Sequence, residues 1–135
     1  MLLNILVACL LMLLTTIIHG TSMILAFRLG HETWVTSQRQ FVRVSGTVLF
    51  MFFVSLLEVF IWAAAYMALG AIKNIEQAIY FSMVTYTTLG YGDVLLDEHW
   101  RLLASFEAAN GIMMFGWTTA IIMAVVRRVY FKDKM

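Results

Sequence analysis

The sequence predicts an all-α integral membrane protein with three transmembrane helices and a short re-entrant helix that leads into a polar loop. Of its 135 residues, 62% are hydrophobic and 13% are charged, and the mean hydropathy is +0.87. A soluble domain is far less apolar than this. Three apolar runs are each long enough for the roughly 20 helical residues that cross a bilayer. The net charge of +1 predicts no nucleic-acid partner.

The first predicted transmembrane helix covers residues 1–27. Its apolar run ends at a short polar stretch that begins with His19, so we expect this side of the helix to contact protein rather than lipid. A cleaved signal peptide is the alternative, because its apolar core has a similar length. No Lys or Arg precedes the run and no Ala-x-Ala cleavage site follows it, which argues against a signal peptide.

The second transmembrane helix is predicted over residues 47–69, with Glu58 near its middle. Before it, residues 28–46 are polar and basic, and we expect either a cytoplasmic loop or a helix lying in the membrane interface. At about 1.5 Å per residue, Glu58 lies within roughly 5 Å of the depth of His19. Since such groups rarely face lipid, we expect the two side chains to pair and to dock the first helix. A proton sensor built on the same pair is the alternative.

Residues 75–86 form a predicted helix that is too short to cross the membrane. Asn74 is the expected N-cap, with Glu76 in the first turn and Gln77 in the capping-box position. A helix of about three turns between two full spans is re-entrant. The negative pole of its dipole lies at its C-terminal end and favours a cation in the loop that follows.

The loop after this helix, residues 87–93, has two glycines that alternate with ordinary residues. Its sequence is Thr87-Thr88-Leu89-Gly90-Tyr91-Gly92-Asp93. Glycine takes positive φ without steric cost, and this alternation lets successive carbonyls point the same way, unlike those of a regular strand. A row of such carbonyls, ending in the Thr88 hydroxyl, can replace the water around a monovalent cation. Gly-x-Gly alone is more often a turn. The cation-binding interpretation depends on the membrane context, because irregular backbone at membrane depth occurs only where protein buries it or where it lines a water-filled path.

The third transmembrane helix is predicted over residues 102–126, after a polar segment in which Trp100 is an expected interface anchor. A basic tail follows over residues 127–135. This tail and segment 28–46 hold seven of the nine Lys and Arg residues. Because basic residues mark the cytoplasmic side, we predict a cytoplasmic C-terminus, with the N-terminus and the glycine loop facing outside in a plasma membrane.

Residues 88–92 resemble the Thr-Val-Gly-Tyr-Gly selectivity filter of potassium channels. Leu89 replaces the usual valine, which is a mild change because this position contributes its carbonyl. The resemblance covers residues 47–126 and implies the two-span pore module, to which the first helix is an addition. The implied parts are an outer helix (47–69), a pore helix (75–86), a filter (87–93) and an inner helix (102–126). Neither of the first two spans carries an arginine ladder, so no voltage sensor is expected.

The resemblance implies a homotetramer that conducts K⁺ passively, since four copies are needed to close a ring of carbonyls. The implied ion-binding residues are Thr88, Leu89, Gly90, Tyr91 and Gly92. The Tyr91 ring is expected to turn away from the pore, onto aromatic residues of the pore helix such as Tyr80 and Phe81. The expected filter supports are Thr87, Asp93, Tyr80, Phe81 and Glu107. Glu107 is expected to hydrogen-bond the pore helix, and it could replace a carboxylate that some channels carry where this chain has Val84.

The third span carries further expected pore residues. Ile112, Phe115 and Thr119 recur at helical spacing and are expected to line the cavity. Gly111 and Gly116 are candidate gating hinges. Close helix packing through these small residues is the alternative.

Two other functions remain as alternatives at this stage: a non-selective monovalent cation channel, and a non-conducting subunit or scaffold with a pore-like fold. An enzyme is not predicted, because the sequence has no Cys/His pair, no His-x-x-x-His spacing and no serine nucleophile motif. We expect no cofactor, with K⁺ only as the permeant ion, and membrane lipids as further partners.

Overall fold

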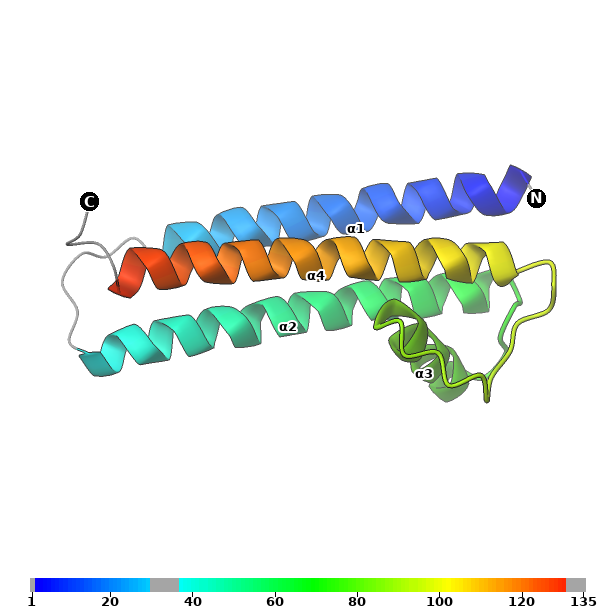
Figure 1. Cartoon of the computed structure of the whole chain (residues 1–135). Coiled ribbons are helices and arrows are strands. Elements are labelled where there is room, and N and C mark those ends of the chain that lie inside the picture. Colours follow the sequence, from blue (N-terminus) through cyan, green and yellow to red (C-terminus); the bar gives the residue numbers. More distant parts are fainter. Residues whose placement is uncertain (1, 30–36, 131–135) are drawn as a thin grey trace.

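Three long helices run side by side along the molecule, and a short helix is set against one end of them (Figure 1). The computed structural model describes residues 2–29 and 37–130. The elements are α1 (Leu2–Leu29), α2 (Ser37–Ala68), α3 (Ile75–Tyr86) and α4 (Arg101–Tyr130). The three long helices are apolar enough and long enough to span a membrane. The predicted fold class, an all-helical membrane protein, is confirmed.

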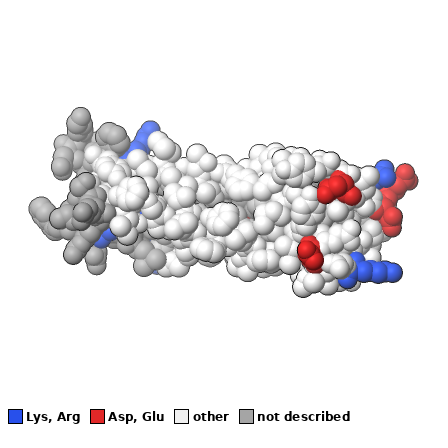
Figure 2. Space-filling view, turned by 90° about the horizontal axis from the view of Figure 1, so that it is seen from below, with Lys and Arg blue, Asp and Glu red and all other residues white. Residues whose placement is uncertain are grey.

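Charged side chains gather at the two ends of the molecule and leave a long uncharged band between them (Figure 2). Arg28, Arg127 and Arg128 lie in the last turns of α1 and α4. Glu58 and Glu107 are both 0% exposed, so they do not interrupt the apolar surface. A band without exposed charge is the part of the molecule that lies in the hydrocarbon core.

α2 begins earlier than the sequence predicted. Residues 37–46, expected in a loop or a separate interfacial helix, continue the same helix as the outer span. This segment contains no proline, and one glycine does not stop a helix, so backbone hydrogen bonding continues into the interface. Residues 30–36 of the predicted segment lie outside the described residues. The C-terminal tail also differs, because α4 continues through residues 127–130.

α1 packs against α2 and α4 along its length, while its other side is apolar and exposed. It is continuous through the polar stretch after Ile18, where the Thr21 hydroxyl donates back to the Ile17 carbonyl. Its buried residues Ala8, Thr15 and His19 face the other helices. The outward side carries exposed leucines suited to lipid contact, namely Leu3, Leu6, Leu10 and Leu13.

α3 enters the membrane part and ends inside it, and the chain then returns toward the end from which it came (Figure 1). Asn74 caps the helix as predicted, since its side chain accepts a hydrogen bond from the Gln77 amide at 3.1 Å. The side of α3 facing α2 and α4 is buried, and the Phe81 ring packs edge-on against Tyr66 with 5.2 Å between centroids. This packing fixes the C-terminal end of α3, where the glycine loop begins.

Candidate functional site

The backbone of residues 88–92 alternates between positive and ordinary φ. Thr88 has a φ of 60°, Gly90 of 51° and Gly92 of 79°, while Leu89 and Tyr91 between them do not have positive φ. Such alternation turns consecutive carbonyls to one side of the chain, which a regular strand does not do. The two glycines were expected to behave in this way. Thr88 was not, because a β-branched residue at positive φ is strained, and strain of this kind gathers at functional sites.

The loop is tied to the last turn of α3 by hydrogen bonds to carbonyls that the helix leaves free. The Thr88 amide donates to the Thr85 carbonyl at 2.9 Å, and the Gly90 amide donates to the Val84 carbonyl at 3.0 Å. The Thr87 hydroxyl donates to the Met83 carbonyl at 2.7 Å. The helix end and its negative dipole pole therefore lie directly beneath the alternating segment.

The sequence comparisons can be set beside this geometry. Residues 11–128 match the sequence profile of the family described as ion channel. The chain belongs to the ion channel family. A 59-residue stretch is 41% identical to the calcium-gated potassium channel TvoK of Thermoplasma volcanium, covering 43% of this chain and 17% of that relative. No solved structure matches the chain significantly. The predicted resemblance to potassium channels is confirmed, and the family points to a channel rather than an enzyme.

The loop over residues 87–93 is exposed to solvent. The side chains of Leu89 and Tyr91 are 54% and 68% exposed. Phe81, an expected partner of the Tyr91 ring, packs on Tyr66 instead. Tyr80, the other expected partner, donates its hydroxyl to Asp93 Oδ2 at 2.7 Å.

Glu107 of α4 meets α3, the predicted pore helix, inside the protein. Its Oε1 is hydrogen-bonded with the Ser82 hydroxyl, and its Oε2 accepts from the Tyr66 hydroxyl at 2.6 Å. Ser82 and Glu107 are both 0% exposed. The structure thus places Glu107 where a hydrogen bond to the pore helix was expected, and adds Ser82 and Tyr66, which the sequence had not singled out as its partners.

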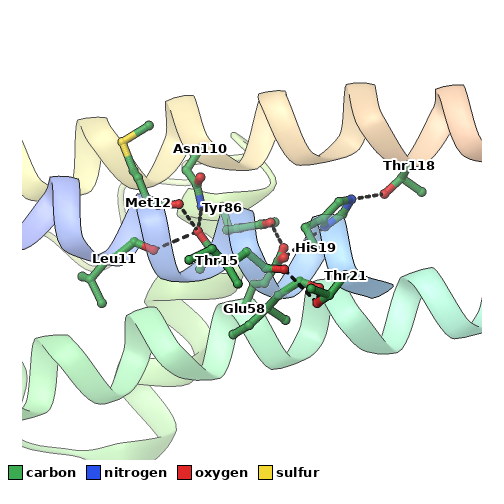
Figure 3. Close-up of polar contacts among 11 residues, drawn as sticks. Leu11, Met12, Thr15, His19, Thr21, Glu58, Tyr86, Asn110 and Thr118 are labelled. Carbon is green, nitrogen blue, oxygen red and sulfur yellow. Dashed lines mark hydrogen bonds and ion pairs between the residues drawn. The ribbon is translucent and has the colours of Figure 1, made fainter. Parts of the chain in front are cut away.

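A second buried carboxylate contacts the last residue of α3, one turn beyond Ser82. Glu58 Oε1 is 3.0 Å from His19 Nδ1, the pairing that their similar depth predicted. Glu58 Oε2 accepts a hydrogen bond from the Tyr86 hydroxyl, and His19 Nε2 lies 3.2 Å from the Thr118 hydroxyl (Figure 3). Sequence reasoning missed Tyr86, although a carboxylate buried in a membrane span needs more than one donor.

The residues expected to line a pore lie on α4. Ile112, Phe115 and Thr119 are exposed in the chain, and the Phe115 ring stands edge-on to Tyr86 with 5.6 Å between centroids. α4 runs unbroken through both candidate hinges. A methyl group at Gly111 would overlap the Tyr86 backbone, whereas one at Gly116 would meet nothing within 4 Å. Gly111 thus has a packing reason to be glycine, and its role as a hinge stays a prediction.

Proposed function

We propose that the protein is a potassium-selective channel that conducts K⁺ passively across the membrane. The observation that carries this proposal is the alternation of positive φ at Thr88, Gly90 and Gly92 on a loop at the end of a re-entrant helix. The carbonyls of residues 88–91 then replace the hydration shell of the ion, with the Thr88 hydroxyl as a further ligand. Gly92 completes the turn of the backbone, and Asp93, bonded to Tyr80, supports the outer end of the loop.

The proposal requires a homotetramer, because one chain supplies only one strip of carbonyls and four strips close a ring. The uncovered face of the chain supports this assembly. The filter residues and the α4 residues Ile112, Phe115 and Thr119 are all exposed. Ile112 and Phe115 are apolar, so their exposure favours a surface that other subunits cover. In the tetramer this face lines the ion path and meets the neighbouring subunits, and the Tyr91 ring packs against protein rather than water.

The orientation belongs to the same proposal. We assign the basic ends of α1 and α4 to the cytoplasm, because Lys and Arg are in excess on the cytoplasmic side of membrane proteins. The N-terminus and the outer mouth of the filter then lie outside a plasma membrane. The similarity to TvoK supports K⁺ conduction, but the chain spans 17% of that relative, so calcium gating is not part of the proposal.

One experiment tests the proposal against two alternatives, a non-selective cation channel and a non-conducting subunit. Purified protein is placed in liposomes, and ion flux is measured under a K⁺ gradient and then under a Na⁺ gradient, with protein-free liposomes as the control. We expect flux with K⁺ only. Equal flux of both ions would favour the non-selective channel. Crosslinking of the same sample is expected to give a tetramer, and absence of both flux and tetramer would favour the scaffold.

A further inference from the structure

The first helix, α1, which precedes the predicted two-span pore module, reaches the base of the proposed filter through three buried side chains. We propose that His19 of α1 is a positioning residue for the filter, acting through Glu58 of α2 and Tyr86 of α3. The inference rests on the proposed function, because it takes residues 88–92 as the K⁺ filter. It gives the additional helix a role in ion selectivity beyond anchoring.

The three side chains form a continuous chain of contacts from α1 to α3. His19, Glu58 and Tyr86 are each 0% exposed. Each carboxylate oxygen of Glu58 has its own partner: His19 Nδ1 at 3.0 Å for Oε1, and the Tyr86 hydroxyl for Oε2. The other nitrogen of His19 meets the Thr118 hydroxyl of α4 at 3.2 Å, so the imidazole is held on both sides (Figure 3).

Tyr86 is the point at which this chain acts on the filter. It is the last residue of α3, two positions before the strained Thr88. Its hydroxyl is held by Glu58, its ring by Phe115, and its backbone carbonyl lies against Gly111. A change in the position of the phenol is therefore passed to the backbone from which the filter starts.

The network responds to the loss of His19 because its three side chains are fully buried and no exposed group replaces the imidazole. Without the imidazole, Glu58 Oε1 keeps no hydrogen-bond partner, and an unpaired polar atom buried in a membrane is strongly unfavourable. The carboxylate then turns toward the remaining donor or toward any space left by the ring. Either movement alters the contact with Tyr86. The other buried carboxylate, Glu107, is bonded to Ser82 and Tyr66 and belongs to a separate set of contacts.

The test compares the K⁺/Na⁺ permeability ratio of the tetramer in liposomes for the wild type, His19→Leu, Tyr86→Phe and the double variant. Each single variant is expected to lower the ratio by about tenfold, which corresponds to one lost buried hydrogen bond. Because both act through one chain of contacts, the double variant is expected to be no worse than either single variant. A double variant whose losses multiply would show independent effects and overturn the proposal.

The matched control is Asn4→Ala. Asn4 also joins α1 to the rest of the protein, since its side-chain amide donates to the His99 carbonyl, but it has no contact with Tyr86. This variant is expected to keep the wild-type ratio. If it lowers the ratio as much as His19→Leu does, the effect comes from general loosening of α1, and the proposal is wrong.

His19→Asn supplies a second comparison, because its amide can donate to Glu58 from near the position of Nδ1. It is expected to retain more selectivity than His19→Leu. Should His19→Leu fail to assemble, Tyr86→Phe decides, and an unchanged ratio in that variant overturns the proposal. A wild-type protein that passes K⁺ and Na⁺ equally would instead refute the proposed function, so the two failures are distinguishable.

Discussion

Gly111 of α4 lies against the backbone of Tyr86 so closely that a methyl group on its Cα would come within 1.9 Å of the Tyr86 carbonyl oxygen. The obstacle is backbone at the end of α3, so it cannot rotate away as a side chain could. Glycine at this position therefore lets α4 and the end of α3 touch. Close packing accounts for this residue without a hinge.

Gly111→Ala is expected to lower the free energy of unfolding by about 1–3 kcal/mol, the usual range for overpacking, even though alanine favours helix. Denaturant unfolding of the protein in detergent micelles measures this. Gly116→Ala is the matched control on the same helix, because nothing lies within 4 Å of the added methyl. That variant is expected to be neutral or more stable by up to roughly 1 kcal/mol. Equal effects of the two substitutions would contradict the packing role of Gly111.

The hydrogen-bond donors and acceptors around Glu107 predict the protonation state of its carboxyl group. The Ser82 hydroxyl has one proton but faces two acceptors, the Val59 carbonyl at 2.9 Å and Glu107 Oε1. If Ser82 donates to Val59, its contact with Glu107 needs a proton on the carboxyl group. Tyr66 donates to the other oxygen. Every group then has a partner when Glu107 is a neutral carboxylic acid.

Glu107→Gln is therefore expected to unfold at the same denaturant concentration as the wild type. Its amide can donate to Ser82 and its carbonyl can accept from Tyr66. Glu107→Leu has the right size but no polar atoms, and is expected to lose about 1–3 kcal/mol because Tyr66 keeps a buried hydroxyl without a partner. Unfolding in micelles compares the two variants. If Gln is as damaging as Leu, Glu107 is ionised in the folded protein.

The sequence could predict depth in the membrane but not rotation of a helix about its axis. Counting residues placed His19 level with Glu58, and the two are bonded. It could not show that Tyr86 completes the contact, because that depends on which way α3 faces after it packs on α2.

The positive φ of Thr88 was also beyond prediction from sequence. Gly90 and Gly92 predict positive φ, because glycine has no side chain that hinders it. Threonine has no preference for the left-handed region. Its conformation is imposed by the contacts around it, such as the bond from its amide to the Thr85 carbonyl. The early start of α2 was missed for a different reason: the polar composition predicted a loop or a separate interfacial helix, although no residue of segment 37–46 stops a helix.

The contact between Tyr80 and Asp93 predicts a pH effect outside the membrane spans. The hydrogen bond to Asp93 raises the pKa of the Tyr80 phenol above its ordinary value. The raised pKa belongs to the folded state. The stabilisation of the folded protein by this hydrogen bond is therefore fully present below the ordinary tyrosine pKa of about 10, and it is lost as the pH rises through the higher pKa of Tyr80. The difference in tyrosine absorbance titration between the wild type and Tyr80→Phe measures this one group.

Asp93→Ala is the partner experiment, because it removes the acceptor and leaves Tyr80 in place. The titration of Tyr80 is expected to return toward the ordinary tyrosine pKa in that variant. An unchanged titration would mean that Asp93 does not hold the phenol in the assembled protein.

Gly90 and Gly70 provide a comparison that separates backbone strain from ion conduction. Gly90 has a φ of 51° in the loop after α3 and Gly70 has a φ of 72° after α2, and a methyl group added at either position would meet no atom within 4 Å. Alanine strains both positions alike, by about 1–2 kcal/mol. The two variants are therefore expected to lose similar stability in unfolding measurements.

Their ion flux is expected to differ. In Gly90→Ala the backbone moves toward negative φ, so the carbonyl of residue 90 leaves the row of carbonyls. K⁺ flux into liposomes then falls to a small fraction of the wild-type value, because conduction depends on the full set of carbonyl sites. Gly70→Ala keeps wild-type flux, because its strain lies outside the filter. Loss of flux in both variants would trace the effect to folding, whereas normal K⁺ flux and selectivity in Gly90→Ala would refute the assignment of this loop as the filter.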